Sequence, residues 1–75
     1  MAYNGWKNWE TWNIVLWASN DEGSYNFVRD NRPYTAEKAA EIAFEMYPNG
    51  TPDMKGPADQ VKVDWEEVAA AWNEE

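Results

Sequence analysis

The chain contains no cysteine and no histidine among its 75 residues. Without cysteine no disulfide can crosslink the chain, and without both residues the common ligands of a structural zinc site are missing. Enzymes that act through an activated nucleophile most often pair it with a histidine base, which this chain cannot supply. The adjacent carboxylates Asp21–Glu22 and Glu66–Glu67 do not replace it, because neighbouring residues on a helix do not face each other. We therefore expect a protein without metal or cofactor that is not an enzyme.

Basic residues are also scarce, with six lysines and arginines against 14 aspartates and glutamates and a net charge of −8. This balance disfavours direct binding to nucleic acid phosphates or anionic membranes, and it favours a partner with a basic surface. No apolar run approaches the ~20 residues that span a bilayer, and the first residues lack the layout of a signal peptide. We expect a cytoplasmic protein that binds neither nucleic acid nor membrane directly.

Aromatic residues, by contrast, are abundant: six tryptophans, four tyrosines and two phenylalanines. Each such side chain can bury about 150–250 Å², which compensates for the small core of so short a chain. The sequence predicts a single helical domain over residues 1–75, present as a monomer or a small homo-oligomer.

The most apolar stretch, residues 8–20 (NWETWNIVLWASN), predicts a helix from Trp9 to Ser19 with Asn8 as its N-cap. At about 100° per residue, apolar side chains surround nearly the whole helix axis. A helix of this kind is buried or is covered by a partner, and we expect a central helix wrapped by the others. Asn13 interrupts the apolar surface, and we expect its amide to hold the turn at 4–5 or another helix end rather than a ligand.

Three further helices are predicted, over Asp21–Asn31, Ala36–Tyr47 and Trp65–Asn73. Thr35 is the expected N-cap of the second of these, because its hydroxyl can accept from a free N–H of the first turn. Asp64 is the expected N-cap of the third, where Glu67 would complete a capping box.

The segments between these helices are rich in turn-forming residues. Residues 47–58 hold three of the four prolines, which predicts a connector without regular structure, pinned by Met54. Residues 60–63 form either a brief extended piece or a helical turn. Residues 20–24 form either a tight turn or the first turn of a helix capped by Asn20, and they lack the ligand spacing of a calcium loop. The predicted fold is all-α: a compact bundle of about four short helices around a Trp-rich central helix.

Three glutamates, Glu37, Glu41 and Glu45, recur every four residues on the face opposite the apolar stripe of their helix. They lie about 6 Å apart along the axis, within the range of phosphate spacing along one nucleic acid strand. Such a row is commonly a solvated face, and the alternative is a row of negative charge that faces a partner. Together with Asp21 and Glu22, these glutamates are the candidate partner-binding residues.

Two segments carry a family resemblance. The first contains Tyr3-Asn4-Gly5-Trp6, Asn8, Glu10-Thr11-Trp12-Asn13, Leu16-Trp17 and Asn20-Asp21-Glu22-Gly23, and the second is Val63–Ala69 (VDWEEVA). They resemble a widespread family of small uncharacterised proteins from bacteriophages and prokaryotic genomes, with the approximate signatures NGWxNxETWNxxLWxxNDEG and V-[ND]-W-x-E-[IV]-A. The resemblance implies a phage-type accessory protein and transfers no established activity.

We expect most residues of these segments to determine the fold rather than to form a site. This structural set is Trp6, Asn8, Trp9, Thr11, Trp12, Asn13, Leu16, Trp17, Asp64, Trp65 and Trp72. Within it, Thr11, Asn13 and Asp64 are the polar residues expected to cap or crosslink the two Trp-rich helices.

The expected function is that of a small acidic accessory protein that binds and modulates a host protein in the host-cell cytoplasm. Its carboxylates would occupy a basic groove by standing in for nucleic acid phosphates. The alternative is a structural or oligomerising accessory subunit with a Trp-rich interface and no inhibitory activity. That alternative gains support if Trp6, Trp17 or Tyr34 is exposed on the monomer.

Overall fold

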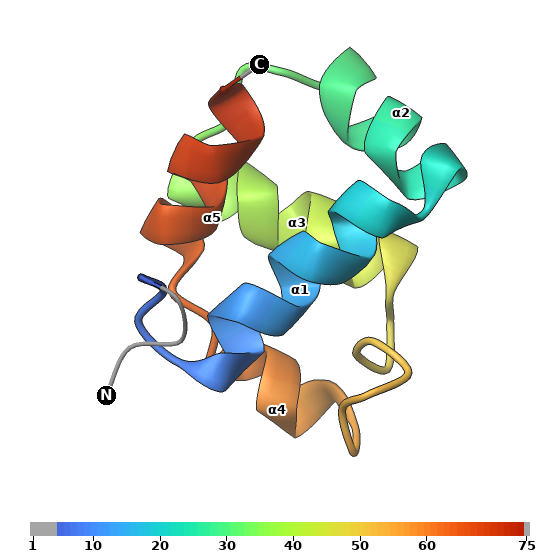
Figure 1. Cartoon of the computed structure of the whole chain (residues 1–75), viewed down its shortest axis with the longest axis vertical. Helices are drawn as coiled ribbons and strands as arrows, with labels where there is room; N and C mark the ends of the chain where they lie inside the picture. Colours follow the sequence, from blue (N-terminus) through green and yellow to red (C-terminus); the bar gives the residue numbers. More distant parts are fainter. Residues whose placement is uncertain (1–4, 75) are drawn as a thin grey trace.

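The computed structural model describes residues 5–74, and this part of the chain consists of five α-helices without a strand (Figure 1). The helices are α1 (Trp9–Asn20), α2 (Glu22–Asp30), α3 (Ala36–Met46), α4 (Pro57–Val61) and α5 (Trp65–Asn73). The predicted all-α fold is confirmed, and the four predicted helices correspond to α1, α2, α3 and α5. None of the helices within residues 5–74 is long and apolar enough to cross a lipid bilayer.

Helix α4 corrects the prediction that residues 47–58 hold no regular structure. It begins at Pro57, whose fixed φ suits the first helical position and whose missing N–H is not needed there. After it, the N–H of Val63 donates to the carbonyl of Gln60 over 3.3 Å, so residues 60–63 form a helical turn. The bundle therefore has five helices instead of about four.

Side-chain oxygens cap the first turns of α1, α3 and α5 at the predicted positions. Asn8, Thr35 and Asp64 each accept a hydrogen bond from the backbone N–H three residues on, over 2.9, 3.1 and 3.2 Å. The capping box predicted for α5 does not close, because the Glu67 carboxylate accepts from the N–H of Lys7 at 2.9 Å. Local capping thus sets where these three helices begin. The Glu67 side chain, which was expected to complete the cap of α5, instead bonds to a residue far away in the sequence.

A single residue, Asp21, separates α1 from α2. Its N–H donates to the carbonyl of Trp17 at 3.2 Å and closes the last turn of α1. Its carboxylate accepts from the N–H of Ser24 at 3.0 Å and caps α2. The predicted cap Asn20 is wrong, since Asn20 is the last residue of α1. Residues 20–24 therefore form a sharp helix–helix corner.

The helices pack around one core. Helix α3 packs mainly against α5, whereas α1 packs against α2, α4 and α5, and it crosses in front of α3 in Figure 1. The buried apolar residues are Ile14, Ala18, Val28, Tyr34, Ala39, Ile42, Ala43, Met54, Val63, Val68, Ala69 and Trp72. Met54 pins the connector as predicted, since its side chain is buried in this core.

The expected burial of the whole of α1 is wrong. Its core side carries Ile14 and Ala18, whereas Trp12, Val15 and Leu16 are only half-buried. Of the six tryptophans, Trp72 alone is buried. The neighbouring helices are short and cover one side of α1, so the opposite apolar side keeps contact with solvent.

The link between α2 and α3 is fastened to the end of α5. The N–H of Tyr34 donates to the side-chain oxygen of Asn73 at 2.6 Å, and the Asn73 amide donates back to the Tyr34 carbonyl at 2.9 Å. The Arg32 guanidinium donates to the carbonyls of Trp72 and Glu74. These bonds satisfy carbonyls that the helix end leaves free, and they bring the middle of the chain to its C-terminal helix.

Two residues of the first signature segment lie outside the described part of the chain. These are Tyr3 and Asn4, the latter also part of the predicted 4–5 turn, and they lie outside residues 5–74. Gly5 has φ +93°, a left-handed conformation that glycine adopts without steric cost and that suits a turn.

Candidate functional site

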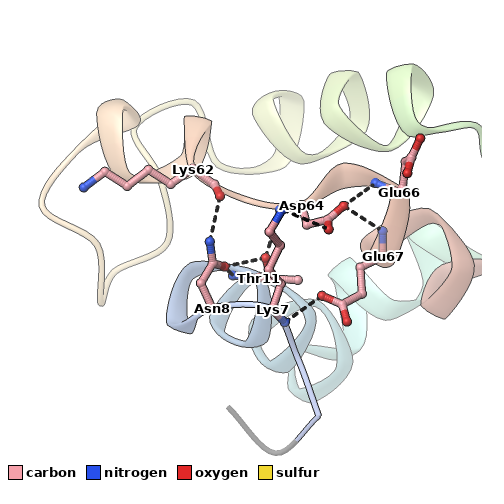
Figure 2. A network of polar contacts seen from close by, with 7 residues as sticks. All are labelled: Lys7, Asn8, Thr11, Lys62, Asp64, Glu66 and Glu67. Atoms are coloured by element: carbon pink, nitrogen blue, oxygen red, sulfur yellow. Dashed lines mark hydrogen bonds and ion pairs between the residues drawn. The ribbon is translucent and has the colours of Figure 1, made fainter. Parts of the chain in front are cut away.

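Polar side chains join the two signature segments at the start of α1 and of α5 (Figure 2). The Thr11 hydroxyl accepts from the N–H of Asp64 at 2.9 Å and donates to Asn8 Oδ1 at 2.6 Å. The Asn8 amide donates in turn to the carbonyl of Lys62 at 2.9 Å. This arrangement agrees with the expected crosslinking role of Thr11 and Asp64.

The donors and acceptors of this network are used within the protein. Thr11 is fully buried, and the Asp64 carboxylate accepts from the backbone N–H groups of Glu66 and Glu67. Lys7 lies 3.9 Å from Asp64 Oδ2 but its side chain is 69% exposed, so this ion pair adds little. The geometry is that of a structural joint, and it leaves no reactive group directed at a ligand.

Asn13 forms a second joint, between α1 and the 47–56 connector. It is fully buried; its Oδ1 accepts from the Thr51 hydroxyl, and its Nδ2 donates to Asp53 Oδ2 at 2.9 Å. The Trp17 indole N–H donates to the same carboxylate oxygen at 3.0 Å. The expected partner of Asn13 was a turn at 4–5 or a helix end, and the structure corrects this to the loop at Thr51 and Asp53.

The Asp53 carboxylate is the exposed end of this second joint. Hydrogen bonds from Asn13 and then from Trp17 favour its charged form and lower the pKa of the Asp53 carboxyl below its usual value of 3.8. Burial acts weakly in the opposite direction. A charge held by two donors of α1 fixes the connector on that helix.

The candidate acidic residues differ in their surroundings. Asp21 is engaged as the cap of α2, and hydrogen bonds from the side chain and backbone of Ser24 lower the pKa of its carboxyl. Glu22 is exposed beside it. The Ser24 hydroxyl lies 3.0 Å from the Tyr47 hydroxyl, which brings the start of α2 beside the end of α3.

The three glutamates of α3, termed the α3 acidic row, are Glu37, Glu41 and Glu45. All three are exposed, and none forms an ion pair with another residue of the 5–74 range. Their carboxylates face solvent and are open to a cationic partner. The described residues contain no group of three or more acidic side chains placed to hold a metal ion.

Sequence reasoning missed a surface on the outer side of α1. Three adjoining hollows share Val15 and are bordered by α1, α2 and α5. We term this surface the α1 groove. Its members from the lead-in, α1, α5 and the residue after α5 are Trp6, Trp12, Val15, Leu16, Ala18, Ser19, Glu67, Ala70, Ala71, Trp72 and Glu74. The sequence does indicate this surface, because apolar side chains surround nearly the whole axis of the helix over residues 9–19. The prediction assigned all of them to a buried surface.

None of the three aromatic residues whose exposure would support a Trp-rich interface is exposed. Tyr34 is buried, and its hydroxyl donates to the carbonyl of Val28 at 2.8 Å. Trp17 is half-buried and its indole is held by Asp53. Trp6 is half-buried as well, and it lines two hollows of the α1 groove.

Comparison with known proteins places the chain by family alone. No curated protein and no solved structure matches it. A family model matches residues 1–75, the entire sequence. The chain therefore belongs to this family, which is described as a family of unknown function (DUF7249).

Proposed function

We propose that this chain is a small acidic accessory protein of phage type that binds and modulates a host protein with a basic surface. The observation that carries the proposal is the α3 acidic row, in which three carboxylates are exposed and unpaired within residues 5–74. The row offers a line of negative charge about 6 Å apart along one helix face. A basic groove that accepts nucleic acid phosphates is the kind of surface it complements.

Two electrostatic arguments support the proposal. The net charge of −8 steers the chain toward cationic surfaces and raises its rate of association with them. The row is also unfavourable for α3 itself, because like charges four residues apart destabilise a helix by about 0.2–0.5 kcal/mol per pair. A bound cationic surface would remove this repulsion.

The test is displacement of a fluorescent DNA duplex from bacterial nucleases and RNA polymerase. The proposal expects the protein to compete with DNA for at least one of these enzymes, and it expects the effect to weaken as salt rises. A triple neutralisation, Glu37→Gln with Glu41→Gln and Glu45→Gln, should abolish competition. Competition that is insensitive to salt would contradict the proposal.

A charge-matched control separates the row from the overall charge. Glu10→Gln, Asp30→Asn and Glu66→Gln remove the same number of charges from α1, α2 and α5. This variant should retain most of the competition. Equal loss in both triple variants would show that net charge, and not the α3 acidic row, drives binding.

A further inference from the structure

The outer side of α1 carries an apolar surface that the fold leaves open. Trp12, Val15 and Leu16 are half-buried, although Ile14 of the same helix is fully buried in the core. We propose that the α1 groove binds an amphipathic helix of a partner protein, with apolar residues in the hollows and lysines or arginines against Glu67 and Glu74. This inference does not use the α3 acidic row and goes beyond the function proposed above.

The shape of the groove fits apolar anchors presented by one helix. Val15 lines all three hollows, while Trp6 and Ser19 each line two of them, so the hollows form one continuous surface. Two of the hollows measure about 160 and 180 Å³. An engineered protein cavity of about 150 Å³ holds a benzene molecule, so each of these has room for one large apolar side chain.

The floor and walls of the groove differ in a way that suits docking. Ala70 and Ala71 of α5 and Ser19 of α1 have small side chains, so they fill little of the groove. Trp6 lines the hollows of Ala70, Ala71 and Ser19, Trp12 lines that of Ser19, and both tryptophans supply large apolar area. Tryptophan is enriched among the residues that contribute most to binding at protein interfaces.

The charge of the rim selects the kind of partner. Glu67 and Glu74 line the groove, and the one cation among its described lining residues is Arg32. The Arg32 guanidinium already donates to the carbonyls of Trp72 and Glu74. The rim is therefore negative, and a helix with cationic residues beside its apolar stripe is complementary to it.

The same charges oppose the other possible occupants. A second copy would bring two chains of net charge −8, each with an acidic rim, against one another. Nucleic acids and anionic membranes carry the same sign of charge as the rim. A cationic amphipathic helix is the occupant that satisfies both the apolar floor and the acidic rim.

The first experiment uses two designed peptides of about 18 residues, or five helical turns. Both lack tryptophan and place leucine at i, i+3, i+4 and i+7; one carries lysine and the other glutamate at the remaining positions. Because Trp6 and Trp12 are half-buried, the lysine peptide should shift the tryptophan emission to shorter wavelength in a saturable manner. It should also move the indole N–H signals of both residues in NMR spectra.

A matched pair of variants locates the binding. Ala70 is an exposed position of α5 within the groove, so Ala70→Arg should leave the helix intact, as circular dichroism would confirm. It should weaken the lysine peptide at least about tenfold, by bulk and by like charge. Val61 is 68% exposed outside the groove, and Val61→Arg should change the affinity less than about twofold.

Several results would overturn the inference. These are equal binding of both peptides, no response to either peptide at about millimolar concentration, or unchanged affinity in Ala70→Arg. A dimer that Ala70→Arg dissociates in analytical ultracentrifugation would assign the groove to a second copy. The triple α3 variant should bind the lysine peptide with an affinity within about twofold of the unmodified protein at 0.15 M salt, where charges are screened over about 8 Å. The experiments can therefore contradict the groove inference and the function proposed for the α3 acidic row independently of each other.

Discussion

The backbone N–H of Asp64 donates a hydrogen bond to the side-chain hydroxyl of Thr11, with 2.9 Å between nitrogen and oxygen. The same hydroxyl donates to the side chain of Asn8, the N-cap of α1, at 2.6 Å. Asp64 is itself the N-cap of α5. One fully buried hydroxyl therefore couples the start of α1 to the start of α5 (Figure 2).

Replacement of this hydroxyl should destabilise the fold at both helix starts. Thr11→Val keeps the shape of the side chain and leaves the Asp64 N–H without its acceptor. An unsatisfied buried donor costs about 1–3 kcal/mol, so the free energy of unfolding should fall by about that amount. Urea denaturation followed by circular dichroism measures the change.

A double-mutant cycle tests whether the two caps act as one unit. Asn8→Ala alone should cost about 1 kcal/mol as the loss of an N-cap. Combined with Thr11→Val, the loss should be smaller than the sum of the two by about 0.5 kcal/mol or more, since both act in one network. Asn8→Ala with Thr35→Ala, at the separate cap of α3, should be additive. Additivity in both pairs would contradict the coupling.

The features that could be predicted from sequence are local ones. The caps Asn8, Thr35 and Asp64 act on N–H groups within three residues, and a short side chain before an apolar periodic run signals them. The first residues of α1, α3 and α5 could be predicted for the same reason. The all-α class is the sum of these local signals.

The features that could not be predicted depend on contacts between distant residues. The Asn13 amide shows that a buried partner is needed, but its partners Thr51 and Asp53 lie 38 and 40 positions away. Periodicity likewise shows that α1 is apolar on all sides, whereas coverage depends on where the other helices pack. The α1 groove follows from that placement and has no local signature.

The joint at Asn13 should respond to paired replacement. Asn13→Leu removes the partner of the buried Thr51 hydroxyl and should lower the free energy of unfolding by about 1–3 kcal/mol. Adding Thr51→Val should recover part of the loss, because replacing both partners with apolar groups of similar shape can be nearly neutral. Thermal and urea unfolding measure both variants. A double variant less stable than Asn13→Leu alone would contradict the role of this bond.

The connector should also be sensitive at Gly50, which has φ +87°. A Cβ there would lie 3.0 Å from the Gly56 carbonyl oxygen and 3.1 Å from the Met54 Cβ. Gly50→Ala combines this crowding with the left-handed backbone, which alone costs about 1–2 kcal/mol for an L-residue. The melting temperature should fall clearly.

Two other glycines serve as controls for Gly50. Gly5 has φ +93° with open space around it, so Gly5→Ala should lower the stability only through the left-handed backbone conformation. Gly23 lies in α2 with ordinary contacts, and Gly23→Ala should stabilise the protein by about 0.4–1 kcal/mol through the unfolded chain. Equal effects at Gly50 and Gly5 would contradict the crowding argument.

The Asp53 carboxylate should make stability depend on pH in the acid range. Its pKa in the folded protein is lowered by hydrogen bonds from Asn13 and Trp17, so the folded state binds a proton less readily than the unfolded chain. Its contribution is then fully present above the unfolded pKa of 3.8 and is lost as the pH falls through the folded pKa. The free energy of unfolding should decrease as the pH drops below about 4.

The Trp17 indole N–H reports on this group directly, because it donates to Asp53 Oδ2 at 3.0 Å. Its NMR signal should move with pH as the carboxyl is protonated, at a midpoint below 3.8, and Asp53→Asn should remove the movement. Asp21 also has a lowered pKa, and Asp21→Asn should reduce the acid dependence of stability while leaving the Trp17 titration in place. A Trp17 signal that stays constant through the acid range, or that titrates equally in Asp53→Asn, would show that the carboxylate does not hold this indole.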